Sequence, residues 1–204
     1  MTRLHLSASR RALLAGAICL AIVGGMLVGH AWPLWTGRTV VLAATVNTTH
    51  RRAPGEYAQL SNAADLLRVS APLPNTKYEG TLVRAIDPWV KEEPGSRGDL
   101  DRRLRGKTVY VQLDPTADGE YAPVSVSLKS VAGAVNLRGI VTWPSGPGAL
   151  HIQYGLDAFY MQEGQPERLE EAFREKRKVQ MEVAIAASGR ARIRRLLVDG
   201  APVR

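Results

Sequence analysis

The chain has 204 residues, 45% of them hydrophobic, and a formal net charge of +8. Three of its 27 basic residues lie near the N-terminus, so residues 36–204 carry the other 24 together with all 19 acidic ones, and the excess is dispersed. A dispersed charge argues against nucleic-acid binding, which favours a clustered basic face. These 169 residues are enough for one domain with a substantial core.

The most informative segment is the apolar run from Ala12 to Ala31, which contains no charged residue. It is about 20 residues long, the length of a helix that crosses a bilayer core. Three arginines precede it, and the first acidic residue of the chain is Glu56. The run therefore predicts a transmembrane helix and the lipid bilayer as a partner.

The arginines also predict the orientation of this helix. Basic residues that flank a first apolar segment tend to stay in the cytoplasm, so residues 1–11 are predicted inside and residues 36–204 outside. Trp32 and Trp35 suit the outer interface, where an indole ring can stay partly hydrated. We expect a single-pass protein of the bacterial inner membrane with a periplasmic C-terminal domain.

The same residues leave an alternative open, which is a cleaved signal peptide ending near Gly29 and Ala31. Cys19 is the only cysteine and lies within the apolar run, so the exported part cannot form an internal disulfide. Gly25 and Gly29 form a G-x-x-x-G pair through which two helices could approach and form a homodimer. Ordinary apolar sequence is the simpler interpretation of that pair.

The first half of the exported region alternates between strand-forming and loop-forming segments. Thr39 to Thr45 is β-branched and aliphatic and predicts a strand, whereas Asn47 to Gly55 is typical of a loop. Strands are predicted over 56–60 and 81–86, a loop over 71–80, and either a helical turn or a strand over 63–69.

Residues 91–106 are the most charged stretch and include three glycines and a proline, which predicts a mobile surface loop. The next segment, Lys107 to Leu113, is the clearest strand because its apolar residues alternate. Tyr121 to Leu128 is predicted to pair with it as a hairpin. Its predicted apolar face holds valines and a leucine, and its polar face holds Ser125 and Ser127.

The C-terminal third completes a mainly β pattern. Strands are predicted over 134–143 and 150–154, on either side of a Pro-Gly-rich turn, and over 179–186 and 191–198 as a final hairpin. Between them, Glu167 to Lys176 predicts a helix whose apolar positions are Leu169, Ala172 and Phe173. The predicted fold class is mainly β (α+β), with one antiparallel sheet or barrel-like domain and one late helix.

Four segments together resemble a family of bacterial membrane-anchored proteins named after a G-D-Y-x-x-L-x-Y motif. That motif corresponds to Gly55–Asn62, where Glu56 replaces Asp and Asn62 replaces the last Tyr. The other three segments are Val109–Leu113, Asn136–Gly139 and Tyr154–Gly164. The resemblance implies a single N-terminal helix and an exported β-rich domain, encoded beside a polytopic membrane protein, and it implies no activity. From the anchor and the lack of a catalytic set we expect another membrane protein as partner.

Candidate chemistry is sparse in the exported region. Its only histidines, His50 and His151, lack the spacing of a metal site, and we expect neither a metal nor a cofactor. His151 is predicted to be a half-buried structural residue. Ser61 and Lys107 are the residue types of a Ser-Lys hydrolase, which needs a nucleophile next to a desolvated lysine.

The quoted motifs supply the candidate binding residues, which combine phenols, carboxylates, an arginine and glycines. They are Gly55, Glu56, Tyr57, Arg138, Tyr154, Gly155, Tyr160 and Glu163. The simpler interpretation is that the aromatic residues are core and that the glycines serve the backbone.

Three hypotheses about function follow. The first is a non-enzymatic accessory module of a membrane or envelope complex. The second is a signal-peptidase-like envelope hydrolase that uses Ser61 with Lys107, or a carboxylate such as Glu56 or Glu163. The third is a small-ligand binder in the mouth of a β-barrel, which needs a concave apolar pocket.

Overall fold

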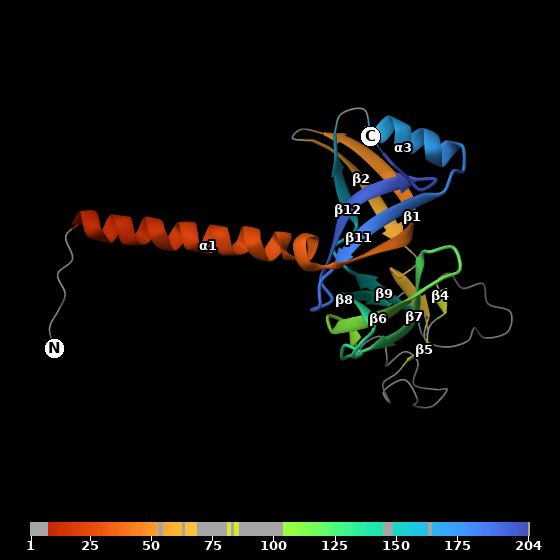
Figure 1. The fold of residues 1–204 in the computed structure, drawn as a ribbon, viewed down its shortest axis with the longest axis horizontal. Helices are drawn as coiled ribbons and strands as arrows, with labels where there is room; N and C mark the ends of the chain where they lie inside the picture. The colour runs from red at the N-terminus through yellow and green to blue at the C-terminus, as the bar shows by residue number, and fades with distance from the viewer. Residues whose placement is uncertain are drawn as a thin grey trace.

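The computed structural model describes residues 8–52, 55–62, 64–68, 81–82, 84–85, 104–144, 149–162 and 165–203. It contains a long helix followed by a β-rich domain (Figure 1). The first elements are α1 (Ala8–Thr36), β1 (Arg38–Arg52), β2 (Gly55–Asn62), β3 (Leu66–Arg68), β4 (Thr81–Leu82), β5 (Arg84–Ala85), β6 (Thr108–Pro115) and β7 (Tyr121–Ser127). The later elements are β8 (Val135–Pro144), β9 (Ala149–Gln153), β10 (Ala158–Met161), α3 (Gln165–Arg174), β11 (Val179–Ile185), β12 (Ala191–Val198) and β13 (Ala201–Pro202).

The described strands form two curled sheets. One has the order β10-β2-β1-β11-β12-β13 and is antiparallel throughout. The other has the order β4-β3-β9-β8-β6-β7-β5 and is antiparallel apart from the short pairs β3–β4 and β5–β7. The domain is therefore mainly β and mainly antiparallel, as the sequence predicts.

One cluster of buried apolar side chains draws on both sheets and forms the core. The first sheet contributes Val40, Met181 and Leu196, and the second contributes Val111 and Ile152. α3 covers part of the first sheet, where it contacts β1 and β2. It buries Leu169 and Ala172 as predicted, but the predicted core residue Phe173 is 54% exposed.

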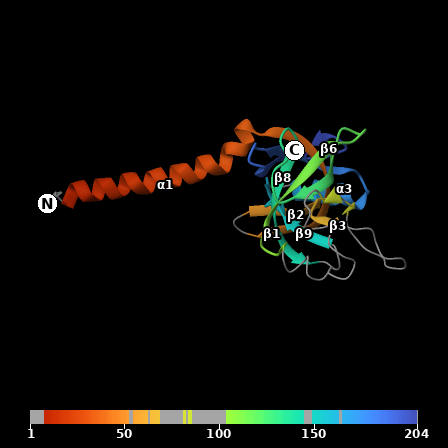
Figure 2. The same cartoon turned by 90° about the horizontal axis from the view of Figure 1, so that it is seen from below.

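α1 extends away from the β domain in both views (Figure 1, Figure 2). Its large apolar side chains are exposed, including Leu13, Leu20 and Met26 at 71–75%. Leu13 and Leu20 share one side of the helix and Met26 lies on another, because successive residues turn by about 100°. Judged by length and mean hydropathy, none of the helices among the described residues qualifies as a membrane span.

Most of the strand predictions that fall on described residues are confirmed. Those over 39–45, 56–60 and 107–113 match β1, β2 and β6, with Val109 and Val111 buried on one face. The later strands and the final hairpin match β8, β9, β11 and β12, and the helix matches α3. Residues 66–68 of the undecided segment form strand β3.

The loop predicted from Asn47 to Gly55 is wrong, because residues 47–52 continue β1. This half of β1 pairs with β2 from Ala44–Asn62 to Arg52–Gly55, with a register shift after Val46. Asn47 falls at this shift, between the paired residues Val46 and Thr48. The pairing of residues 48–52 with β2 cannot be read from a local sequence window.

The predicted faces of β7 are correct only for Val126, which is buried. Val124 is 36% exposed, whereas Ser125 and Ser127 are buried. A register shift between Gln112 and Leu113 of β6 alters the alternation. The buried hydroxyls are satisfied, since Ser125 donates to Gln112 Oε1 at 3.1 Å and Ser127 donates to a nearby main-chain carbonyl.

The loops predicted over 71–80 and 91–106 lie outside the described residues, except that the end of the second is described. There Leu104 is only 4% exposed and belongs to the core cluster.

Candidate functional site

The named motif lies on β2, where its residues pair with two other strands. Tyr57 is opposite Tyr160 of β10, and Glu56 is opposite Met161. The structure therefore places the predicted residues Glu56, Tyr57 and Tyr160 on neighbouring strands, with the Gly55 backbone at the end of the ladder. The Tyr160 side chain is 74% exposed. Glu163, the remaining candidate of this segment, lies outside the described residues.

The other predicted residues meet at a second location, where β8 pairs with the end of β9. Gly139 lies under Tyr154, and a Cβ at Gly139 would be 2.7 Å from the Tyr154 ring and 2.4 Å from Ile152 Cγ2. Only glycine fits this contact. Tyr154 is 7% exposed and donates from its hydroxyl to the Ala64 carbonyl at 2.8 Å. The simpler interpretation of Tyr154 as a core residue is thus confirmed.

Arg138 immediately precedes Gly139, and a main-chain hydrogen bond holds its backbone in place. Its N–H donates to the Gly189 carbonyl at 2.8 Å, which joins β8 to the turn between β11 and β12. Asn136 holds the preceding turn, since its side chain bonds the backbone of Val131 and Ala134 at 2.8–3.0 Å. The Asn136–Gly139 motif therefore positions Arg138 beside the final hairpin.

A cavity of about 860 Å³ opens at this point, between the β domain and α1. Arg138, Arg190 and Arg192 line it together with Tyr154 and Gly155, and none of its described lining residues is acidic. We call this cavity the arginine pocket.

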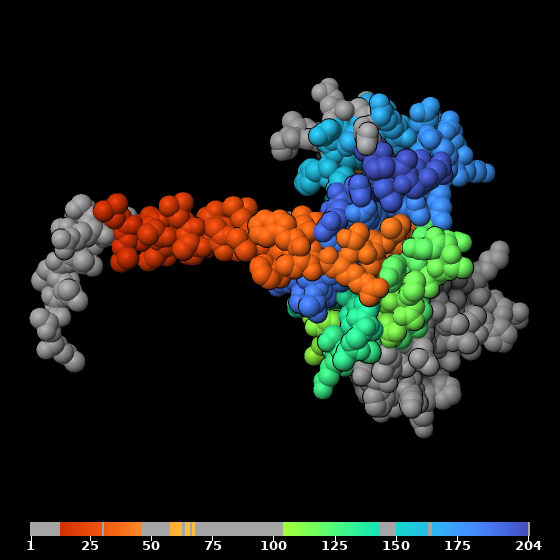
Figure 3. All heavy atoms as spheres, viewed as in Figure 1, coloured from red at the N-terminus to blue at the C-terminus, as the bar shows by residue number. Residues whose placement is uncertain are grey.

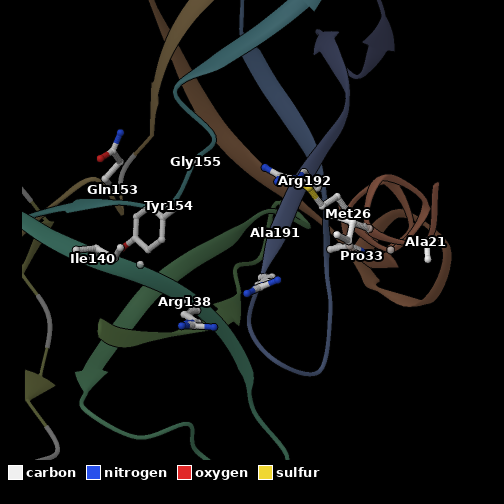
Figure 4. A pocket seen from close by; sticks show the side chains of 15 residues that line it. Ala21, Met26, Pro33, Arg138, Ile140, Gln153, Tyr154, Gly155, Ala191 and Arg192 are labelled. Atoms are coloured by element: carbon white, nitrogen blue, oxygen red, sulfur yellow. The ribbon is translucent and has the colours of Figure 1, made fainter. Parts of the chain in front are cut away.

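The opposite wall of the arginine pocket is α1, which contributes Ala21, Ile22, Gly25, Met26, Gly29 and Pro33. Figure 4 shows Met26 and Pro33 on one side, Arg138 and Tyr154 on the other, and Arg192 between them. The corner between helix and domain is also visible in the space-filling view (Figure 3).

Sequence reasoning missed Arg190, Arg192 and the α1 wall. Arg192 lies on the predicted final strand and Arg190 immediately precedes it, but no motif marked either residue. The contribution of α1 was not readable, since it depends on the angle at which the helix leaves the domain.

That angle is set at Gly37, the single residue between α1 and β1. A Cβ there would lie 2.3 Å from the Pro33 carbonyl oxygen and 3.0 Å from the Ile185 backbone. The Gly37 N–H also donates to the Pro33 carbonyl at 2.9 Å. The helix and the first strand are thus joined by a tight turn rather than by a flexible linker.

Two arginines reinforce the junction from the domain. Arg194 of β12 donates to the Leu34 carbonyl near the end of α1. Arg38, at the start of β1, donates to the Tyr121 hydroxyl at 2.9 Å. Its Cζ also lies over the Tyr121 ring, 5.8 Å from the ring centroid. The first interaction ties the end of the helix to β12, and the second joins the start of β1 to β7 of the other sheet.

The changed last position of the named motif, Asn62, organises a turn with Asp65. Asp65 accepts from the backbone N–H and from the side-chain amide of Asn62, both at 2.7 Å. Burial raises the pKa of Asp65 to about 6, and the nearby Asp157 carboxylate adds to this rise. Burial, together with the Asp65 charge, raises the pKa of Tyr154 well above its ordinary value.

The candidate catalytic residues and His151 are not among the described residues that line the arginine pocket. Ser61 lies on β2 of one sheet, and Lys107 immediately precedes β6 of the other, with an exposed side chain. His151 is exposed rather than half-buried as predicted, and its Nδ1 lies 2.9 Å from Thr142 Oγ1. Within the described part of the chain, no three His, Cys, Asp or Glu side chains group as metal ligands would.

Comparison with known families gives one match. The model of the GDYXXLXY protein family matches residues 19–196. The chain belongs to the GDYXXLXY family. The match runs from the middle of α1 into β12, so it includes the named motif on β2 and the strands that form the arginine pocket. Searches of curated proteins and of solved structures found no match.

Proposed function

We propose that this GDYXXLXY family member is a non-enzymatic accessory protein that α1 anchors in the bacterial inner membrane. In this proposal the N-terminus is cytoplasmic and the β domain lies at the periplasmic face, beside a partner membrane protein. The observation that carries the proposal is the exposure of apolar side chains on all sides of α1, such as Leu14 at 55%, Leu20 at 75% and Met26 at 71%, which lie about 120° apart around the helix axis. A helix that is apolar all round needs lipid or protein around it.

The junction supports a role in positioning. Gly37 joins the helix and the domain through a single tightly packed residue, and Arg194 donates a hydrogen bond to the Leu34 carbonyl in the last turns of the helix. A domain attached in this way stays close to the membrane surface in a fixed orientation. That geometry suits a module that contacts a neighbouring membrane protein.

The hydrolase alternative gains no support from the geometry, because Ser61 and Lys107 are on different sheets. A general-base lysine must also be desolvated, and Lys107 is exposed.

Anchoring is tested by alkaline carbonate extraction of membranes from cells that express the full chain with a C-terminal tag. We expect the protein in the pellet, with an intact mass that includes α1. A matched variant with Leu20→Lys and Val23→Lys should leave the membrane fraction, since each central charge costs about 3 kcal/mol on insertion. A soluble wild-type chain trimmed near Ala31 would contradict the proposal.

The accessory role is tested by crosslinking in native membranes, followed by identification of the crosslinked proteins. We expect a second membrane protein in the crosslinked product. Recovery of the chain as an isolated monomer in mild detergent, with no crosslinked product, would contradict this part of the proposal.

A further inference from the structure

The arginine pocket has the two properties of a phospholipid site in one cavity. Its domain wall presents three guanidinium groups, from Arg138, Arg190 and Arg192, and no acidic side chain among the described lining residues. Its α1 wall is apolar, with Ile22 and Met26 exposed at 58% and 71%. Guanidinium groups bind phosphate through paired hydrogen bonds, whereas acyl chains need an apolar surface.

The length of the α1 wall matches the depth of one bilayer leaflet, over which a lipid acyl chain extends. Its residues run from Ala21 to Pro33. At 1.5 Å per residue this is about 18 Å, close to the thickness of one leaflet of a bilayer core of roughly 30 Å. Gly25 and Gly29 have no neighbouring atom within 4 Å of an added Cβ, so this side of α1 is open.

The arginines lie at the level where headgroups would be. An adjoining cavity of about 290 Å³ shares Arg138 and Arg190 with the arginine pocket and is also lined by Trp32. Trp32 follows the end of the apolar run, and tryptophan is enriched at the membrane interface. The charged end of the pocket and the interfacial residue therefore share one depth.

We propose that the arginine pocket binds an anionic phospholipid of the periplasmic leaflet, with the phosphate on Arg138, Arg190 and Arg192 and an acyl chain along α1. This inference rests on the proposed anchoring of α1. The bound lipid would link the final hairpin, β8 and α1, and so would help to fix the domain on the membrane surface.

The test uses the full chain reconstituted into phosphatidylcholine vesicles that contain a trace of photoactivatable phosphatidylglycerol. After illumination, mass spectrometry locates the crosslinked residues. We expect adducts on pocket-lining residues of α1 and β12, displaced by unlabelled phosphatidylglycerol but not by added phosphatidylcholine. Glycerol phosphate in solution should compete poorly, because it lacks acyl chains.

The variant Arg138→Gln/Arg190→Gln should weaken phosphatidylglycerol competition roughly 30-fold, from the usual contribution of two basic residues near an anionic surface. The matched control is Arg174→Gln/Arg177→Gln, which removes the same charge from exposed positions at and beyond the end of α3 and should retain wild-type binding. Arg190→Gln alone, at an exposed position, tests the site if the double variant misfolds.

Each contrary result is separable. Flotation of the vesicles in a density gradient shows whether the chain is inserted. If the chain does not float with vesicles of any composition, the anchoring proposal fails and the lipid site fails with it. If the chain floats but the double variant binds as wild type, or adducts map elsewhere, only the lipid site is overturned. Equal competition by glycerol phosphate would mean a soluble phosphate ligand, and crosslinks to a second protein in the pocket would mean a protein occupant; either contradicts the lipid assignment.

Discussion

Asp65→Asn should make the stability of the protein less dependent on pH. Asp65 is partly buried beside Asn62, and its pKa is raised from 3.8 to about 6. The folded chain therefore holds a proton that the unfolded chain has lost between these values. This contribution to stability is present below pH 3.8 and is lost as the pH rises through 6.

The size of the effect follows from the shift. The difference between 3.8 and about 6, at 1.36 kcal/mol per pKa unit, corresponds to about 3 kcal/mol. The Asp65 side chain is partly exposed, so solvent screening reduces this, and we expect about 2 kcal/mol. An amide at position 65 does not titrate, so the variant should gain about 2 kcal/mol relative to wild type between pH 4 and pH 7.

The assay is urea unfolding of the full chain in mild detergent at several pH values. The comparison of wild type with Asp65→Asn across pH cancels the hydrogen bond to Asn62 that the variant loses at every pH. Asp118→Asn, in an exposed turn, is the matched control. A difference between wild type and Asp65→Asn that stays constant from pH 4 to pH 7 would refute the reasoning.

Three other substitutions test the packing around the site. Gly139→Ala should lower the free energy of unfolding by about 1–3 kcal/mol in the same urea assay, since the added Cβ would lie 2.7 Å from the Tyr154 ring. Tyr154→Phe should cost about 1–3 kcal/mol because it leaves the buried Ala64 carbonyl without its donor; an unchanged urea midpoint would contradict this. Gly37→Ala should broaden the distance distribution between spin labels on α1 and on the β domain, whereas Gly24→Ala, with nothing within 4 Å, should leave it unchanged.

Regular elements could be predicted wherever one local pattern dominates. The alternation of Val109, Val111 and Leu113 predicts both the strand and its buried face, and the spacing of Leu169 and Ala172 predicts α3. The mainly antiparallel β class follows from these elements and their short connections. The family was also predictable, because the order of four motifs is a property of the sequence alone.

Features that depend on distant residues could not be predicted. Residues 48–52 lie in a strand because β2 pairs beside them, and the buried Ser125 depends on a register shift between β6 and β7. The contact between Gly139 and Tyr154 was not foreseen, although both residues were in quoted motifs. The arginine pocket needs the helix angle set at Gly37, which no local pattern indicates.

Anchoring by α1 is tested most directly through Cys19, the only cysteine of the chain. In spheroplasts that express the full protein, a membrane-impermeant maleimide should not label Cys19 until detergent is added. In a Cys19→Ser background, the exposed Ser130→Cys should be labelled from outside without detergent. Free labelling of Cys19 in spheroplasts, or a mature chain that lacks it, would contradict membrane anchoring.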